Sequence, residues 1–172
     1  MVCPKFKFNG EPDANTNPQG SGNKTMIPNF IAEVKITYSN PVKSADRIKV
    51  VGSSDVARAL REFWPSYDHV EFCYMLMLNR QNQILGYNQV AKGGITGTVV
   101  DTRVIYQVAL KANASSIIIA HNHPSGNLDP SNADKKITRE VKDAGKILNI
   151  TLLDHVILTS DGFHSMADEG EL

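Results

Sequence analysis

Runs of apolar side chains, and the spacing within them, divide the chain after residue 30 into strands and amphipathic helices. Alternation of apolar and polar residues, or a short continuous apolar run, predicts a strand, whereas apolar residues three and four apart predict a helix. Helices are expected at about 54–64, 102–113 and 132–148. Strands are expected at 31–38, 69–78, 83–91, 116–120, 150–159 and 163–165, with a short extended piece at 48–51.

Turn-forming residues lie between these elements. Pro65 ends the first helix because proline lacks the N–H group that a helix interior needs, and residues 79–82 suit a hairpin turn. Asn149 can end the long helix. The strand 116–120 is apolar after its first residue, which is typical of a strand covered on both faces. Strands that alternate with helices therefore predict a single α/β domain at residues 31–172, with a mixed β-sheet flanked by helices.

Residues 1–30 differ from the rest of the chain. They contain few periodic hydrophobic residues and many glycines, prolines and asparagines, so they predict an irregular N-terminal arm with little capacity to bury surface. Either the protein's own core or a neighbouring chain could hold the arm in place. An oligomer formed through the arm is therefore one expectation.

The composition excludes some classes of partner. The chain has 172 residues, with 18 basic and 18 acidic side chains, so its formal net charge is zero. Such a balance gives no overall attraction to nucleic acid or an anionic membrane. Cys3 and Cys73 have no nearby cysteine partner, which favours two reduced thiols. No segment approaches the roughly 18 apolar residues of a membrane span, and the N-terminus lacks the apolar core of a signal peptide. These features predict a cytoplasmic protein.

The strongest chemical signal follows the strand 116–120. His121 and His123 are two residues apart, so in extended backbone both imidazoles lie on the same side. Pro124 favours extended geometry for His123, because the residue before a proline avoids the helical region. Asp134 stands in the first turn of the next helix, after a loop long enough to fold back. Two neutral imidazoles and one carboxylate match a catalytic zinc site with a fourth position for water.

A purely structural interpretation exists for part of this pattern. Ser131 and Asp134 form a helix-capping sequence, with the serine as cap and the acid near the positive end of the helix. Taken alone, this pair favours capping. Together with His121 and His123 it favours metal binding, and the Ser131 hydroxyl could leave the cap to face a substrate. Asn122 points away from the histidines and is better placed to organise the loop.

The order His-x-His-Pro followed by Ser-x-x-Asp resembles the JAMM metalloprotease signature. It is more similar still to the RadC-like branch of that family, in the segments 121–126, 130–134, 144–148 and 153–157. The resemblance covers about residues 45–169. It implies the JAMM fold, a mixed sheet between helices related in architecture to cytidine deaminases. Full-length members carry a helix-hairpin-helix domain before the catalytic one, and this chain is expected to be a short form without it.

The resemblance also implies the site residues. His121, His123 and Asp134 would be the zinc ligands, and the family needs one glutamate from an earlier strand. Glu71 matches this position, because it is the only acid within the apolar run 70–78. A buried carboxylate is costly unless it is paired or functional. The alternatives for Glu71 are a solvent-facing strand edge or a buried ion pair.

The implied reaction is the hydrolysis of an amide or isopeptide carbonyl. Zinc lowers the pKa of a bound water toward neutrality. Glu71 takes the proton of that water and later passes it to the leaving amine. Ser131 donates a hydrogen bond to the developing oxyanion. Asp154 or His155 could orient a ligand histidine through its free ring nitrogen, although a buried Asp–His pair is an equal alternative.

Other functions fit these residues less well. The letters His-Asn-His do not indicate an HNH nuclease, whose residues are spread over a ββα element, and a zinc deaminase would need a Pro-Cys-x-x-Cys pattern. An iron oxygenase could use two histidines and a carboxylate, but the surrounding residues do not suggest one. A metallopeptidase remains as the first hypothesis. A DNA-associated module, linked to repair or mobile elements and with a structural or idle zinc site, is the alternative.

Overall fold

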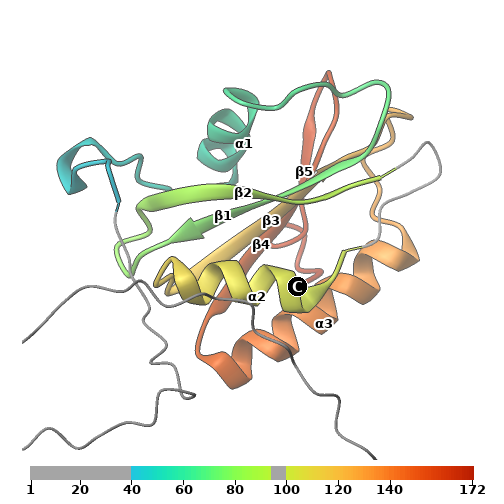
Figure 1. Cartoon of the computed structure of the whole chain (residues 1–172). Coiled ribbons are helices and arrows are strands. Elements are labelled where there is room, and N and C mark those ends of the chain that lie inside the picture. Colours follow the sequence, from blue (N-terminus) through green and yellow to red (C-terminus); the bar gives the residue numbers. More distant parts are fainter. Residues whose placement is uncertain (1–39, 94–99) are drawn as a thin grey trace, which may run out of the picture. The chain divides into compact units, whose positions relative to one another are not determined.

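The computed structural model describes residues 40–93 and 100–172, and within them five strands form one mixed β-sheet (Figure 1). The order across the sheet is β2-β1-β3-β4-β5. β3 and β4 run parallel, and the other neighbouring strands are antiparallel. The predicted α/β fold with a mixed sheet is therefore confirmed. The strands are β1 (Phe72–Leu78), β2 (Ile84–Lys92), β3 (Ser116–Asn122), β4 (Thr151–Leu158) and β5 (Phe163–Ser165).

Helices cover both faces of this sheet. α1 (Ser53–Arg61) packs on one face, and α2 (Thr102–Lys111) and α3 (Asn132–Leu148) pack on the other (Figure 1). A short 3-10 helix, η1 (Ser44–Asp46), precedes α1. Alternate residues of β3 supply both cores: Ile118 and Ala120 pack on the α1 side, and Ile117 and Ile119 pack on the α2–α3 side. The expectation that this strand is covered on both faces is confirmed.

An irregularity in β4 alters which of its side chains face α3. Ile117 of β3 pairs with Leu152, whereas the next residue, Ile118, pairs with Asp154. Leu153 is thus an extra residue in β4. Because successive side chains of a strand alternate between faces, one inserted residue exchanges the faces of everything after it.

Several predicted bounds need correction. β1 begins at Phe72 rather than residue 69, because the backbone of residues 67–70 bonds to a side chain instead of a neighbouring strand. β3 continues to Asn122 rather than ending at residue 120, because β1 and β4 still pair with its last two residues. α1 ends at Arg61, and a turn then buries Trp64. α3 has the predicted bounds.

Some predictions fall on residues that the structure does not describe. These are the arm at 1–30, the strand at 31–38 and most of the glycine-containing connection after β2. Among the described residues, no helix has the length and apolar character needed to span a membrane.

Candidate metal centre

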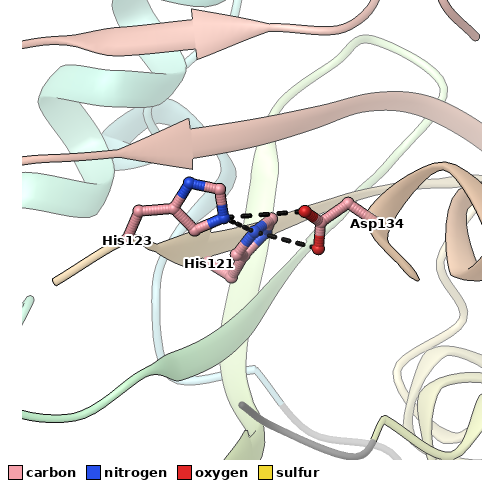
Figure 2. Close-up of side chains that lie close together, drawn as sticks. All are labelled: His121, His123 and Asp134. Atoms are coloured by element: carbon pink, nitrogen blue, oxygen red, sulfur yellow. Dashed lines mark hydrogen bonds and ion pairs between the residues drawn. The ribbon is translucent and has the colours of Figure 1, made fainter. Parts of the chain in front are cut away.

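His121, His123 and Asp134 converge at one point between the end of β3 and the start of α3 (Figure 2). The two histidine Nε2 atoms are 2.9 Å apart. The Asp134 carboxylate lies 3.2 Å from His121 Nε2 and 3.6 Å from His123 Nε2. The three side chains therefore lie close together, as expected from the sequence. The spacing follows from the strand alternation that places both imidazoles on one side of the chain.

Backbone carbonyls and side chains fix which histidine nitrogen faces this point. His123 Nδ1 lies 2.7 Å from the carbonyl oxygen of Asn127. A carbonyl can only accept, so His123 Nδ1 carries the hydrogen and the Nε2 lone pair is left for a metal ion. This contact could not be predicted from the sequence, because it depends on the turn that the loop adopts after His123.

Hydrogen bonds link His121 to two further side chains, His155 and Thr138. Thr138 donates to the Asp134 carbonyl oxygen at 2.6 Å, so its Oγ1 accepts from His155 Nδ1, also at 2.6 Å. His155 Nε2 then accepts from His121 Nδ1 at 2.8 Å. The His121 Nε2 lone pair again faces the point where the three side chains converge. Burial lowers the pKa of His155 well below its ordinary value, so this imidazole is neutral.

Of the two residues proposed to orient a ligand, His155 contacts His121 and Asp154 does not. Asp154 instead accepts hydrogen bonds from the Ser165 hydroxyl and the Ala167 N–H, which anchor β5 and the segment after it. Thr138 was missed by sequence reasoning. The sequence does show a threonine four residues after Asp134, on the inner face of the helix. The spacing along the helix does not reveal that its partner is His155.

Asp134 caps α3 and faces the histidines at the same time. Its carboxylate accepts from the Ser131 N–H at 2.7 Å, and its own N–H donates to Ser131 Oγ at 3.1 Å. Burial alone would raise the pKa of Asp134, but in the metal-free site hydrogen bonds with His121 and His123 outweigh this effect and hold the pKa well below its usual range. Ser131 need not leave the cap to act, since a hydroxyl that accepts one hydrogen bond still has its own hydrogen to donate.

Glu71 lines the same cavity as His121 and Asp134, but it precedes β1 instead of lying within it. Its side chain is partly buried. Burial raises the pKa of Glu71; the charge of Asp134 adds to this increase, and His121 and His123 oppose it. A raised carboxyl pKa suits a group that must both accept and return a proton. The Glu71 carbonyl accepts from the Gly93 N–H at 2.8 Å.

Asn122 organises the backbone on both sides of Glu71, rather than the loop that follows β3. Its Nδ2 donates to the carbonyls of Tyr67 and Val70, both at 3.0 Å, and its Oδ1 accepts from the Phe72 N–H at 2.8 Å. The side chain is fully buried. One residue thus links the strand end that carries the two histidines to the segment that carries the glutamate.

Two further histidines, and Glu62 at the end of α1, lie outside this cluster. His164 pairs with Glu171 at 2.9 Å, and His69 and Glu62 are exposed. Cys73 does line the cavity, directly opposite His121 in the sheet. Burial raises the pKa of its thiol to about 12, so it presents a neutral sulfur surface.

The three convergent side chains fit a divalent cation. A metal bound at about 2 Å to each of three ligands holds the ligand atoms roughly 3–4 Å apart. The measured separations of 2.9, 3.2 and 3.6 Å lie close to that range. Two imidazole nitrogens with hydrogen-bonded opposite nitrogens, and one carboxylate, form a donor set that zinc accepts.

Comparison with known proteins agrees with this geometry. Residues 50–171 match the model of the RadC-like JAB domain, which is most of the chain and includes the whole cluster. The chain belongs to the RadC-like JAB domain family. The resemblance seen in the His-x-His-Pro and Ser-x-x-Asp segments is thereby confirmed.

Curated relatives in this family have uninformative names. A UPF0758 protein of Flavobacterium johnsoniae is 42% identical over 122 residues, which are 71% of this chain and 53% of the relative. A UPF0758 protein of Chlorobaculum parvum is 40% identical over 124 residues, 72% of this chain and 55% of the relative. One from Clostridium botulinum is 38% identical over 129 residues, 74% and 56% respectively. The chain spans about half the length of the curated relatives it matches.

Proposed function

We propose that this protein is a zinc-dependent hydrolase of peptide or isopeptide bonds. The observation that supports this most directly is the shared cavity, in which Glu71 lies beside the convergent His121 and Asp134. A proton-accepting carboxylate next to a three-ligand metal site is the arrangement needed to activate water against an amide carbonyl. Membership of the JAB domain family agrees with this chemistry.

His121, His123 and Asp134 would hold the zinc ion. Zinc supplies a positive charge that polarises the substrate carbonyl and acidifies the attacking water. Glu71 accepts the proton of that water. The raised pKa of Glu71 makes the protonated form accessible, so the same carboxyl can deliver the proton to the leaving amine.

Ser131 completes the set. Its Oγ accepts the Asp134 N–H, which fixes the hydroxyl at the first turn of α3 while its hydrogen remains available. A fixed donor can stabilise the negative charge that develops on the carbonyl oxygen, and such donors contribute roughly 10²–10³-fold to rate in other acyl-transfer sites.

Metal content tests the first half of this proposal. Protein purified without chelators should contain about one zinc per chain by mass spectrometry, as expected for a three-ligand site. The variant His123→Ala should lose it, and the control variant His164→Ala should keep it, because His164 pairs with Glu171 instead. Zinc-free wild-type protein that also fails to bind added zinc would contradict the proposal.

Turnover tests the second half. Glu71→Gln should retain zinc and lose roughly 10²–10⁴-fold in hydrolysis, which is the usual contribution of a general acid–base group. The assay is cleavage of a mixed peptide and isopeptide library, followed by mass spectrometry. Equal cleavage by Glu71→Gln and wild type would show that another group moves the proton.

A further inference from the structure

The cavity next to the metal centre extends well beyond the reacting residues. It has a volume of about 360 Å³ and lies between the sheet and α3. Glu71, His121 and Asp134 are among the residues that line it. Ligand pockets of this kind span roughly 300–1,000 Å³. A cavity at the lower end of this range suits one side chain with its flanking backbone, rather than a folded partner.

The remaining wall of this cavity is mostly apolar. Ile119 and Cys73 come from β3 and β1, Ile137 and Ala133 come from α3, and Val100 precedes α2. Ile119 and Cys73 are almost completely buried. His155 also lines the cavity, but both of its ring nitrogens are already bonded, one to His121 and one to Thr138. Its ring can therefore contribute only an aromatic surface.

Charged groups stand at the outer edge of the cavity. Lys136 and Glu140 belong to the exposed side of α3 and form a long ion pair of 3.9 Å with each other. Away from the metal centre, the inner side chains that the structure describes thus offer carbon and sulfur surface with no unpaired charge. A polar side chain placed there would lose its water without a compensating hydrogen bond, whereas an apolar one would gain by burial.

We infer that this cavity is a specificity pocket for a medium-sized aliphatic side chain, such as leucine, on the substrate residue beside the scissile bond. The cavity directly borders His121 and Asp134. A substrate whose carbonyl reaches these two residues therefore places its neighbouring side chain in this cavity. This inference rests on the proposed function. It narrows the substrate from any amide to one next to a branched apolar residue.

Hydroxamates test the pocket without any knowledge of the natural substrate, because the hydroxamate group itself binds zinc. Three probes are compared by calorimetry on the zinc-loaded protein. They are acetohydroxamate, the hydroxamate of 4-methylpentanoic acid, and the hydroxamate of succinamic acid, which has nearly the same shape but ends in an amide. The branched hydrocarbon should bind at least about tenfold more tightly than either of the other two, as expected for burial of a leucine-sized side chain.

Two variants show whether the gain comes from this cavity. Ile137→Asn should reduce the preference for the hydrocarbon to within about threefold and leave acetohydroxamate binding unchanged. Ala133→Phe should do the same by filling the space, and it changes only an exposed helix position. The matched control is Ile147→Asn, an identical substitution at a position on α3 that is 81% exposed, which should keep the full preference.

The possible failures are distinguishable. If acetohydroxamate binds but the hydrocarbon and amide probes bind equally, the pocket inference is wrong while the metal site stands. If the preference survives in both Ile137→Asn and Ala133→Phe, the hydrocarbon binds elsewhere and the inference is again wrong. If no hydroxamate binds to the zinc-loaded protein, the proposed function fails, and the pocket inference fails with it.

Discussion

Two irregular segments bring residues to the candidate site, and they are held in different ways. The segment 123–131 after β3 is held largely by its own residues, through the His123–Asn127 contact and local backbone and side-chain turns. The segment 67–71 before β1 is held mainly by Asn122, some 50 residues away in the sequence. The ring of His123 is therefore oriented by a residue four positions away, whereas the position of Glu71 depends on a remote side chain.

Replacing Asn122 is the most direct test of whether segment 67–71 depends on this remote side chain. Asn122→Ala leaves two carbonyls and one buried N–H without their partner, and each such loss costs about 1–3 kcal/mol. We expect a decrease of about 3 kcal/mol or more in the free energy of unfolding, measured by urea denaturation. Hydrolysis should fall while zinc content is kept, because the histidines remain in place.

The control for Asn122→Ala is Gln107→Ala, at an exposed position on α2, which should change stability by less than about 0.5 kcal/mol. A stable Asn122→Ala protein with normal turnover would show that segment 67–71 holds itself in place.

The next largest effect concerns the histidine side of the site. Thr138→Val preserves the shape of the side chain but removes the hydroxyl that accepts from His155. His155 then loses its fixed orientation against His121, and loss of such a supporting contact typically costs 10–100-fold in metal affinity. Competition with a chromogenic chelator measures this affinity. Unchanged zinc affinity would mean that the hydrogen bonds from Thr138 through His155 do not hold His121 in place.

Acidity should weaken metal binding through His123. The hydrogen bond with Asp134 raises the pKa of His123 above 6.5 in the metal-free protein, and the contact with Asn127 adds to this. A proton on His123 competes with the metal, so zinc affinity should begin to fall at a pH above 6.5 and continue to fall as the pH decreases. Zinc titrations between pH 8 and pH 5.5 check the direction. Affinity that is constant over this range would contradict it.

The smallest effect is expected within the locally held segment. Gly126 has a positive φ of 78°, and nothing lies within 4 Å of where a Cβ would stand. Gly126→Ala therefore tests backbone strain alone, which costs about 1 kcal/mol. Thermal unfolding should show a small decrease in Tm with zinc affinity nearly unchanged. A large loss of affinity would mean that the turn is less robust than its own hydrogen bonds suggest.

The sequence predicted the parts of this molecule that depend on neighbouring residues. The histidines could be placed from strand alternation and Pro124, and the capping role of Ser131 and Asp134 from their spacing. Glu71 was found only through its family resemblance and was assigned to the interior of a strand that actually begins one residue later.

The partners of Asn122 and Thr138 could not be predicted in the same way. Each hydrogen bond joins elements that meet only in the folded sheet, so no spacing along the chain reveals it. The same reason left open whether Asp154 or His155 would orient a ligand histidine, because their order within a strand does not tell which face the strand turns toward α3.

The extra residue in β4 decides that question. Leu153 shifts the alternation, so that His155 faces α3 and His121 while Asp154 faces the opposite side. Without the insertion the two would exchange places, and a carboxylate would stand behind the ligand histidine. A negative group there would draw the His121 hydrogen toward itself and make the imidazole a stronger donor to a metal ion. By presenting a neutral imidazole instead, the bulge sets the electronic character of the candidate metal site from a position outside it.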